Sequence, residues 1–313
     1  MRSDAADLQI AFFFRLEEIR ALYLQDALFD TDARVDITQI DSELKELTER
    51  AVLNKLARFG IRAEVFLPVP TLIKENPRLV GYYRLLYGIS QKEFHKTHGW
   101  LKRFEENGKN KPFPENEIEE AVNILLPIGE ALVRGIDSIS KEIAHELQLL
   151  TLGPQFRGGR NTDLGKAATA KTFALIKDIV RDSINEETEN SITIINSAGR
   201  VVLIQFSSDP DIAITERLKS GDRKLVSIEI KGGKDYSNAH NRLGEAEKSH
   251  QKARQDGFFE FWTIVRVDID PEIAKKESPT TSHFFNLDAI EMLSSEEGKL
   301  FRDILASILS IKT

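Results

Sequence analysis

The sequence contains no cysteine and no long apolar run among its 313 residues. Without cysteine, the chain has no disulfide framework, no thiol nucleophile and no thiolate-ligated zinc. No apolar run approaches the roughly 20 residues of a membrane-spanning helix, and the start of the chain lacks the basic region of a signal peptide. We therefore expect a cytoplasmic protein without a membrane partner.

The sequence also lacks an excess of positive charge. It carries 43 Lys and Arg residues against 50 Asp and Glu residues, which gives a formal net charge of -7. This balance argues against a protein that coats nucleic acid through bulk charge, but it leaves room for a local basic patch. With 41% hydrophobic and 30% charged residues, the composition is that of a globular protein with one large domain or two ordinary domains.

The first half of the chain has the pattern of helices. Apolar residues recur at helical spacing over 7–28 and again over 117–150. Between these stretches, Asp36 or Thr38 is a candidate cap for a further helix. We predict a helical region over residues 1–152.

The second half changes to a mixed pattern of helices and strands. Residues 151–161, TLGPQFRGGRN, have the composition of a loop rich in glycine and arginine, and residues 216–224, ERLKSGDRK, that of a polar loop. The remaining pattern predicts, in chain order, a helix at 162–183, strands at 191–196, 200–206, 211–215 and 225–231, a helix at 238–256 and a strand at 258–269. We therefore predict an α/β (α+β) fold class, in which a mixed-sheet domain over 153–313 follows the helical region.

Two of the predicted strands carry charged residues at their ends. Pro210 and Asp211 open one strand, while Glu229 and Lys231 close another, with 18 residues from the aspartate to the glutamate. Side chains two apart on a strand share a face, so Glu229 and Lys231 point the same way, and Asp211 joins them if the strands are neighbours. Asp209 is a rival for the place of Asp211, because it points to the same face.

These three side chains suit metal-dependent hydrolysis of a phosphodiester. Two carboxylates on a rigid sheet can hold Mg²⁺, a hard cation that prefers oxygen ligands and acidifies a bound water. A neighbouring lysine ammonium can orient that water and offset charge on the transition state. The competing interpretation is an edge strand whose alternating charges face water, with Asp211 as an ordinary residue at the start of a strand.

The predicted series contains the core order α-β-β-β-α-β with one further strand, and it carries Pro-Asp before an acid-x-Lys tripeptide; in this it resembles the PD-(D/E)XK nuclease superfamily. The resemblance covers roughly residues 160–270 and implies a restriction-endonuclease-like mixed-sheet core. It also implies that Asp211 and Glu229 are metal ligands, that Lys231 is the catalytic lysine and that Mg²⁺ is the cofactor. One departure is that the predicted helix 162–183 lacks the glutamate that many members carry near the metal.

Within that superfamily, the chain is similar to the XcyI-type restriction endonucleases. The similarity lies in the run EIKGGKDYSNAHNRLGEAEKSHQKAR (229–254) and in EFWTIVRVD, which follows it. This similarity implies a bacterial type II restriction endonuclease, a homodimer that cuts double-stranded DNA at a palindromic, GC-rich site such as CCCGGG. The helical region would then support dimerisation and contact DNA. Two alternatives stay open: another DNA nuclease with the same core, of the repair or mobile-element type, and a non-catalytic DNA-binding protein.

The residues that follow the acid-x-Lys tripeptide are candidates for DNA contact. Residues 231–254 carry six basic and three acidic side chains, so this segment is locally basic in an acidic protein. The side chains just past the strand are expected to reach bases or phosphates: Lys234, Asn238, His240, Asn241 and Arg242. The competing interpretation is a capped helix start with solvated polar residues. Glu245, further along the same helix, suits either the active site or an ion pair with Lys248.

A second basic group surrounds the Gly-rich segment ahead of the helix 162–183. Arg157, Arg160 and Lys166 lie around this segment, and a helix N-terminus beside them could hold a phosphate. We expect the segment to be a flexible connection that contacts the DNA backbone through Arg157 and Arg160.

Overall fold

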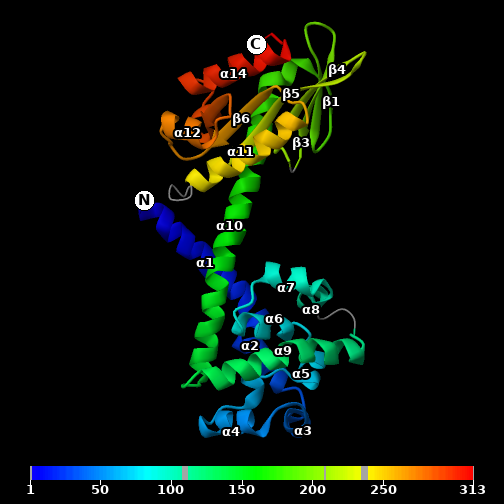
Figure 1. The fold of residues 1–313 in the computed structure, drawn as a ribbon, viewed down its shortest axis with the longest axis vertical. Helices are drawn as coiled ribbons and strands as arrows, with labels where there is room; N and C mark the ends of the chain where they lie inside the picture. The colour runs from blue at the N-terminus through cyan, green and yellow to red at the C-terminus, as the bar shows by residue number, and fades with distance from the viewer. Residues whose placement is uncertain (1, 108–111, 208, 234–238, 313) are drawn as a thin grey trace. The chain divides into compact units, whose positions relative to one another are not determined.

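Figure 1 shows the computed structural model of the chain, which describes residues 2–107, 112–207, 209–233 and 239–312. The chain divides into two compact units, Met1–Gly159 and Arg160–Thr313. Each unit has a hydrophobic core of its own. None of the helices in the described part of the chain has the length and apolar character that crossing a membrane requires.

The first unit is built of helices, as the periodic apolar pattern predicts. Its elements are α1 (Arg2–Tyr23), α2 (Gln25–Asp32), α3 (Ile37–Leu47), α4 (Arg50–Arg58), η1 (Ala63–Val65), α5 (Pro70–Glu75), α6 (Leu79–Leu86), α7 (Gln91–Thr97), η2 (Gly99–Leu101), α8 (Lys102–Asn107), α9 (Glu115–Gly135) and the first part of α10 (Lys141–Val180). Asp36 caps α3 by accepting a hydrogen bond of 2.8 Å from the backbone N–H of Thr38. One of the two predicted caps is thereby confirmed.

Helix α6 is the most deeply buried element of this unit, and all eight of its residues are buried. The hydroxyls of Tyr82, Tyr83 and Tyr87, which lie on α6 or directly after it, donate to backbone carbonyls of the segment 64–67 at 2.7–2.9 Å. Burial raises the pKa of each of these phenols, so they act as neutral donors. The tyrosines are therefore core residues that hold this segment in place.

The segment predicted to be a Gly-rich loop is helical instead. Residues 151–161 lie inside α10, which runs for 40 residues. Each glycine costs a helix about 1 kcal/mol relative to alanine, and Pro154 removes one backbone donor. Packing outweighs this cost, because α10 packs through Leu152 and Phe156 in the first unit and contributes Ile176 to the core of the second.

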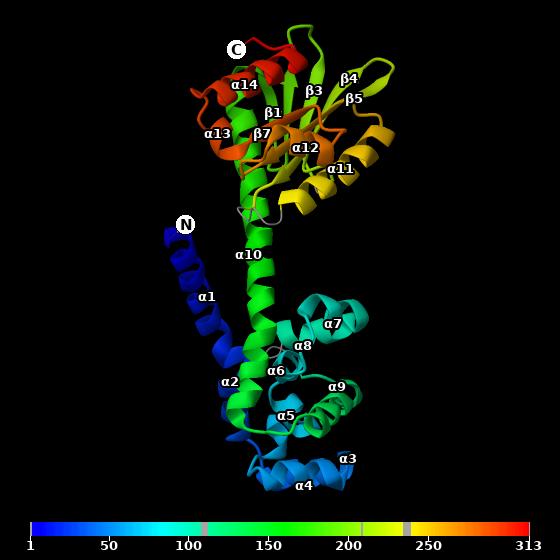
Figure 2. The same ribbon diagram turned by 60° about the vertical axis from the view of Figure 1, so that its left-hand side comes forward.

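The second unit is a seven-stranded sheet with helices on both faces (Figure 2). After α10 its elements are η3 (Arg181–Ser183), β1 (Ile184–Glu187), β2 (Ser191–Ile195), β3 (Val201–Phe206), β4 (Ile212–Leu218), β5 (Gly221–Lys231), α11 (Ala239–Gln255), β6 (Glu260–Val265), α12 (Pro271–Glu277), β7 (His283–Asn286), α13 (Leu287–Glu291) and α14 (Glu296–Leu309). The strands follow one another in chain order across the sheet; β1 to β5 are antiparallel, and β6 and β7 run parallel to β5. The predicted fold class, helices followed by a mixed sheet, is confirmed.

The polar stretch 216–224, predicted to be a loop, is mostly strand. β4 continues to Leu218 and β5 starts at Gly221, so a tight turn joins two long strands. Opposite charges face each other across this hairpin: the guanidinium of Arg217 lies 3.6 Å from the Asp222 carboxylate. Such cross-strand pairs stabilise a sheet without an apolar pattern, which explains why composition alone predicts a loop here.

The two faces of the sheet are covered by different helices (Figure 1). Helices α10 and α14 pack on the face that carries Ile228 and Ile230 of β5, together with Trp262 of β6. Helix α11 lies on the other face, where its Leu243 packs against Val265 of β6. Successive strand residues point to opposite faces, so the charged side chains at the end of β5 belong to the face covered by α11.

Candidate active site

The ends of β4 and β5 bring the three predicted catalytic side chains together. Asp211 stands directly before β4, and Glu229 and Lys231 lie at the end of β5, its antiparallel neighbour. The Asp211 carboxylate crosses to β5, where its Oδ2 atom accepts a hydrogen bond of 2.7 Å from the backbone N–H of Ile230. This bond places Asp211 between the glutamate and the lysine along the strand.

Glu229 and Lys231 share a face of β5, as the strand alternation predicts. The Lys231 Nζ atom donates to the Glu229 Oε2 atom at 3.0 Å. Glu229 is only 4% exposed, and β5 is an interior strand between β4 and β6. The competing interpretation of an edge strand with charges facing water is therefore wrong.

Burial dominates the electrostatics of the two carboxylates. It raises the pKa of Asp211, while the Ile230 N–H and the Lys231 ammonium act in the opposite direction. Burial also raises the pKa of Glu229; Lys231 opposes this effect, and the Asp211 charge adds to it. The single ammonium of Lys231 offsets only part of the charge of the two ionised carboxylates, so a further cation beside them would favour their ionised forms.

Asp209, the rival for the motif aspartate, has a different partner. Its Oδ2 atom accepts a hydrogen bond from Lys252 on α11, and the pair is exposed. Asp211 instead is bound to β5 next to Glu229. The contacts therefore favour Asp211 over Asp209 as the carboxylate that works with Glu229.

The donor set fits a hard divalent cation. Both Asp211 and Glu229 offer carboxylate oxygens, the ligands that Mg²⁺ prefers. No cluster of three or more His, Asp or Glu residues with metal-binding geometry occurs in the described parts of the chain. Two carboxylates are still sufficient for Mg²⁺, because this ion retains several waters and shares substrate phosphate oxygens.

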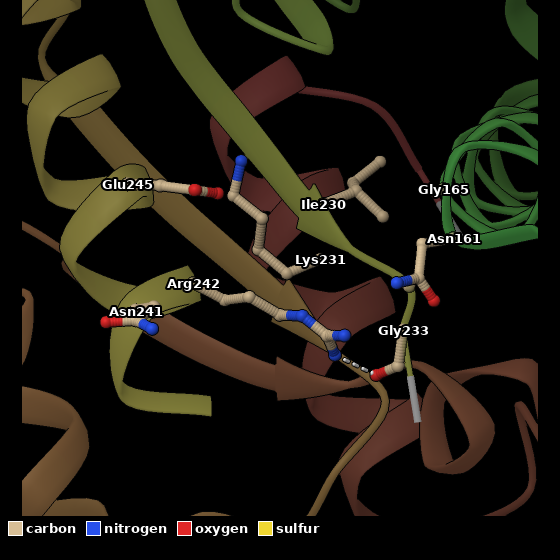
Figure 3. A pocket seen from close by; sticks show the side chains of 9 residues that line it. Asn161, Gly165, Ile230, Lys231, Gly233, Asn241, Arg242 and Glu245 are labelled. Atoms are coloured by element: carbon tan, nitrogen blue, oxygen red, sulfur yellow. Dashed lines mark hydrogen bonds between the residues drawn. The ribbon is translucent and has the colours of Figure 1, made fainter. Parts of the chain in front are cut away.

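A pocket of about 380 Å³ adjoins Lys231 at the end of β5 (Figure 3). It is lined by residues of α10, of the end of β5, of the turn after β5 and of α11: Asn161, Gly165, Ile230, Lys231, Gly232, Gly233, Asn241, Arg242 and Glu245. Figure 3 shows the Glu245 carboxylate pointing toward the Lys231 side chain, with Asn161 on the far side. Asn161 is a site residue that sequence reasoning missed, because its position depends on α10 continuing through residues 151–161.

The Gly232–Gly233 turn after Lys231 is closely packed from two sides. A Cβ atom on Gly232 would lie 2.2 Å from the Ala168 Cβ atom and 2.8 Å from the Leu164 carbonyl oxygen of α10. On the other side, the Arg242 Nη1 atom donates to the Gly233 carbonyl at 2.5 Å. Glycine is therefore required at this turn by the close approach of α10 and Arg242.

We expect Gly232→Ala to destabilise the protein by about 1–3 kcal/mol, the usual cost of overpacking. The added methyl must displace backbone of α10 or the end of β5, and cleavage should fall with it. Gly244→Ala on α11 is the matched control, because a Cβ there meets no atom within 4 Å and alanine favours a helix by up to about 1 kcal/mol. Urea unfolding of both variants checks this; equal stability of the two would contradict the packing argument.

The predicted DNA contacts after β5 fall into two groups. Lys234 and Asn238 lie outside the described residues. Asn241 and Arg242 line the pocket, whereas exposed His240 lies with its Nδ1 atom 3.5 Å from a carboxylate oxygen of Glu277. Arg242 is thus tied to the Gly233 carbonyl through one nitrogen, and it has further N–H groups for a ligand.

The predicted phosphate site around the Gly-rich segment is wrong in its geometry. Arg157, Arg160 and Lys166 lie within the continuous helix α10, so no helix N-terminus exists among them. Arg157 and Lys166 are exposed and Arg160 is partly exposed, so any contact with DNA would come from a helix surface. It would not come from a flexible loop.

The fold and this site together define a nuclease-type core in which two carboxylates and a lysine meet at the ends of neighbouring strands. Comparison with known proteins specifies the family: a model described as "XcyI restriction endonuclease" matches residues 13–312. The type II restriction enzyme Cfr9I of Citrobacter freundii is 42% identical over 312 residues, which cover 97% of this chain and 94% of that enzyme. The type II restriction enzyme XcyI of Xanthomonas campestris pv. cyanopsidis is 42% identical over 313 residues, with the same coverage.

The chain belongs to the XcyI restriction endonuclease family. Membership extends over nearly the whole chain, so it includes the helical first unit as well as the sheet. The resemblance predicted from the β5–α11 sequence is confirmed, and the class of the protein is that of a type II restriction endonuclease.

Proposed function

We propose that this protein is a Mg²⁺-dependent endonuclease that hydrolyses phosphodiester bonds of double-stranded DNA at one specific sequence. The observation that carries the proposal is the meeting of Asp211, Glu229 and Lys231 at the ends of β4 and β5. Asp211 and Glu229 would hold the metal. When bound, the ion would supply Lewis acidity at the scissile phosphate.

The chain's own groups would carry out the rest of the reaction. Lys231 donates a hydrogen bond of 3.0 Å to Glu229, and it would orient the attacking water and offset negative charge on phosphorus. The Ile230 N–H fixes the direction of the Asp211 carboxylate. Water attack on phosphorus breaks the bond to the 3′-oxygen and leaves a 5′-phosphate and a 3′-hydroxyl.

DNA contacts would come from the start of α11 and from the exposed surface of α10. Arg242 and Asn241 border the pocket beside Lys231, where they would hold the backbone or read base edges. His240 is a further proposed contact at the start of α11. Lys234 and Asn238, which lie outside the described residues, stay predicted DNA contacts. Arg157 and Arg160 would contact phosphates from α10, since exposed guanidinium groups bind phosphate well.

For the target, we propose a palindromic, GC-rich site, with CCCGGG as the specific candidate. A palindrome is cut in both strands when a two-fold dimer places one active site on each strand. We therefore propose a homodimer, with the helical first unit supporting dimerisation and DNA contact. Its mass in solution, measured by light scattering, tests this assembly.

A plasmid digest tests the proposed activity. With Mg²⁺ we expect discrete fragments, and with EDTA we expect intact plasmid, because the two carboxylates alone cannot activate the phosphate. A smear or nicking at unpaired regions would indicate a repair or mobile-element type of nuclease. DNA retention on a gel without any Mg²⁺-dependent cutting would indicate a non-catalytic binding protein.

A further inference from the structure

A closed set of hydrogen bonds joins α11, β6 and the turn after α12, on the face of the sheet that carries Glu229. His250 of α11 is fully buried, and its Nε2 atom lies 2.8 Å from the Thr263 hydroxyl of β6. Thr263 lies 2.9 Å from the Thr281 hydroxyl, and Thr281 lies 2.7 Å from the Ser278 hydroxyl. The set returns to α11 where Ser278 donates to the Glu247 Oε2 atom at 3.2 Å.

Glu247 fixes the direction of every bond in this set. Although burial raises the pKa of Glu247, donors from Thr280, Gln251 and Ser278 outweigh that effect and lower the pKa. The Thr280 N–H and hydroxyl donate to it at 2.9 and 2.6 Å, and the Gln251 amide donates at 2.8 Å. An ionised carboxylate only accepts hydrogen bonds, so the Ser278 hydroxyl must donate to it.

The direction then propagates to the histidine. Because the Ser278 proton points to Glu247, Thr281 donates to Ser278, Thr263 donates to Thr281, and the His250 Nε2–H donates to Thr263. Burial lowers the pKa of His250 to about 4, so the ring is neutral and its Nδ1 atom is the acceptor nitrogen. That Nδ1 atom is buried without a hydrogen-bond partner among the described residues, which is tolerable for an acceptor and costly for a donor.

The set lies directly beside the catalytic strand. Thr263 is the register partner of Glu229 on the parallel pair β5 and β6, so the two side chains stand on the same face of neighbouring strands. The same helix carries Glu245 two residues before Glu247 and Arg242 five residues before it, and both line the pocket at Lys231. The position of α11 on the sheet therefore decides where these two side chains meet Lys231.

We propose that His250 and Thr263 are positioning residues for DNA cleavage, which hold α11 on β6 so that Arg242 and Glu245 meet Lys231. This inference rests on the proposed function of the Asp211–Glu229–Lys231 site. Neither residue needs to touch DNA or the reacting atoms. Their effect on the reaction comes from the geometry of α11.

The test is Thr263→Val, which keeps the side-chain shape and removes both hydrogen bonds of the hydroxyl. With Mg²⁺ and a duplex that the wild type cuts, the single-turnover rate at saturating enzyme should fall by about 10–100-fold, the usual effect of losing a partner that orients active-site groups. The Kd for the same duplex in Ca²⁺ should stay within about threefold of the wild-type value. Thr263 is not proposed to touch DNA, and sites without shared partners contribute nearly independently. Thr263→Ser, which restores the hydroxyl, should recover most of the rate.

Thr172→Val is the matched control in the same unit. Thr172 is as buried as Thr263, but its hydroxyl donates to the Ala168 carbonyl of its own helix, α10, at 3.0 Å. A loss of rate in Thr263→Val and not in Thr172→Val, at comparable thermal stability, supports positioning. If Thr263→Val does not fold, Ser278→Ala breaks the set at another link and should lower the rate in the same direction.

The wild-type rate in a folded Thr263→Val or Ser278→Ala variant would overturn the inference. An equal loss of rate in Thr172→Val would overturn it as well, since the effect would then be one of stability. Failure of the proposed function is separately visible. It would appear as full cleavage by Lys231→Ala, whatever the network variants do.

Discussion

Replacing Lys231 by alanine should lower the single-turnover rate of DNA cleavage by about a hundredfold to a thousandfold, the range for removing one donor that stabilises transition-state charge. The ammonium lies 3.0 Å from Glu229 and is the cation that opposes the burial of both carboxylates. Binding of the target duplex, measured in Ca²⁺ by fluorescence anisotropy, should change far less. The lysine is proposed to act on the reacting phosphate, and other side chains would supply most of the affinity.

Lys219→Ala provides the control for this experiment. Lys219 is exposed in the turn between β4 and β5, at the opposite end of β5 from Lys231. The Lys219→Ala variant loses the same charge from the same hairpin but keeps the site unchanged, so its cleavage rate should match that of the wild type. Full-rate cleavage by Lys231→Ala would remove the lysine from the proposed mechanism.

Replacing Glu229 by glutamine should have an effect of similar size through the metal. We expect cleavage to fall by more than about a hundredfold, because direct ligands matter more than the partners around them, which account for 10–100-fold. The amide keeps the shape of the side chain but removes one of two negative charges from the donor set. A Mg²⁺ titration of the cleavage rate should therefore show that a higher concentration is required, as well as a lower maximum.

Glu216→Gln is a close match for that substitution. Glu216 of β4 is also 4% exposed, and it accepts hydrogen bonds of 3.0 Å from Asn196 and Arg200. The Glu216→Gln variant thus tests the loss of a buried glutamate that belongs to the same sheet but lies outside the site. It should lose stability and keep the Mg²⁺ dependence of the wild type. If both variants required the same increase in Mg²⁺ concentration, a metal role for Glu229 would be contradicted.

Much of the fold can be predicted from local pattern. The apolar period predicts the helices of the first unit, and the alternating runs predict β2 to β6. The failures occur where tertiary contacts outweigh local preference. Packing carries α10 through a segment with three glycines, and cross-strand charge pairs make strands of 216–224. The four-residue strand β7 is too short to show a period.

For the candidate site too, some features can be predicted from the sequence, and others depend on tertiary contacts. Glu229 and Lys231 are two residues apart on one strand, so their shared face follows from sequence alone. The preference for Asp211 over Asp209 does not, because it depends on which carboxylate reaches the Ile230 N–H. Residues such as Asn161 and His250 depend on how helices pack on the sheet, and no spacing in the chain brings them to the site.

The measurement that tests the central proposal most directly is run-off sequencing of plasmid digested with Mg²⁺. We predict that every read ends within one six-base palindrome, CCCGGG, at the same position on both strands, and that a plasmid lacking this site stays intact. Reads that end at scattered positions would contradict a site-specific endonuclease. Ends within a different sequence would contradict the proposed target and leave the site-specific activity standing.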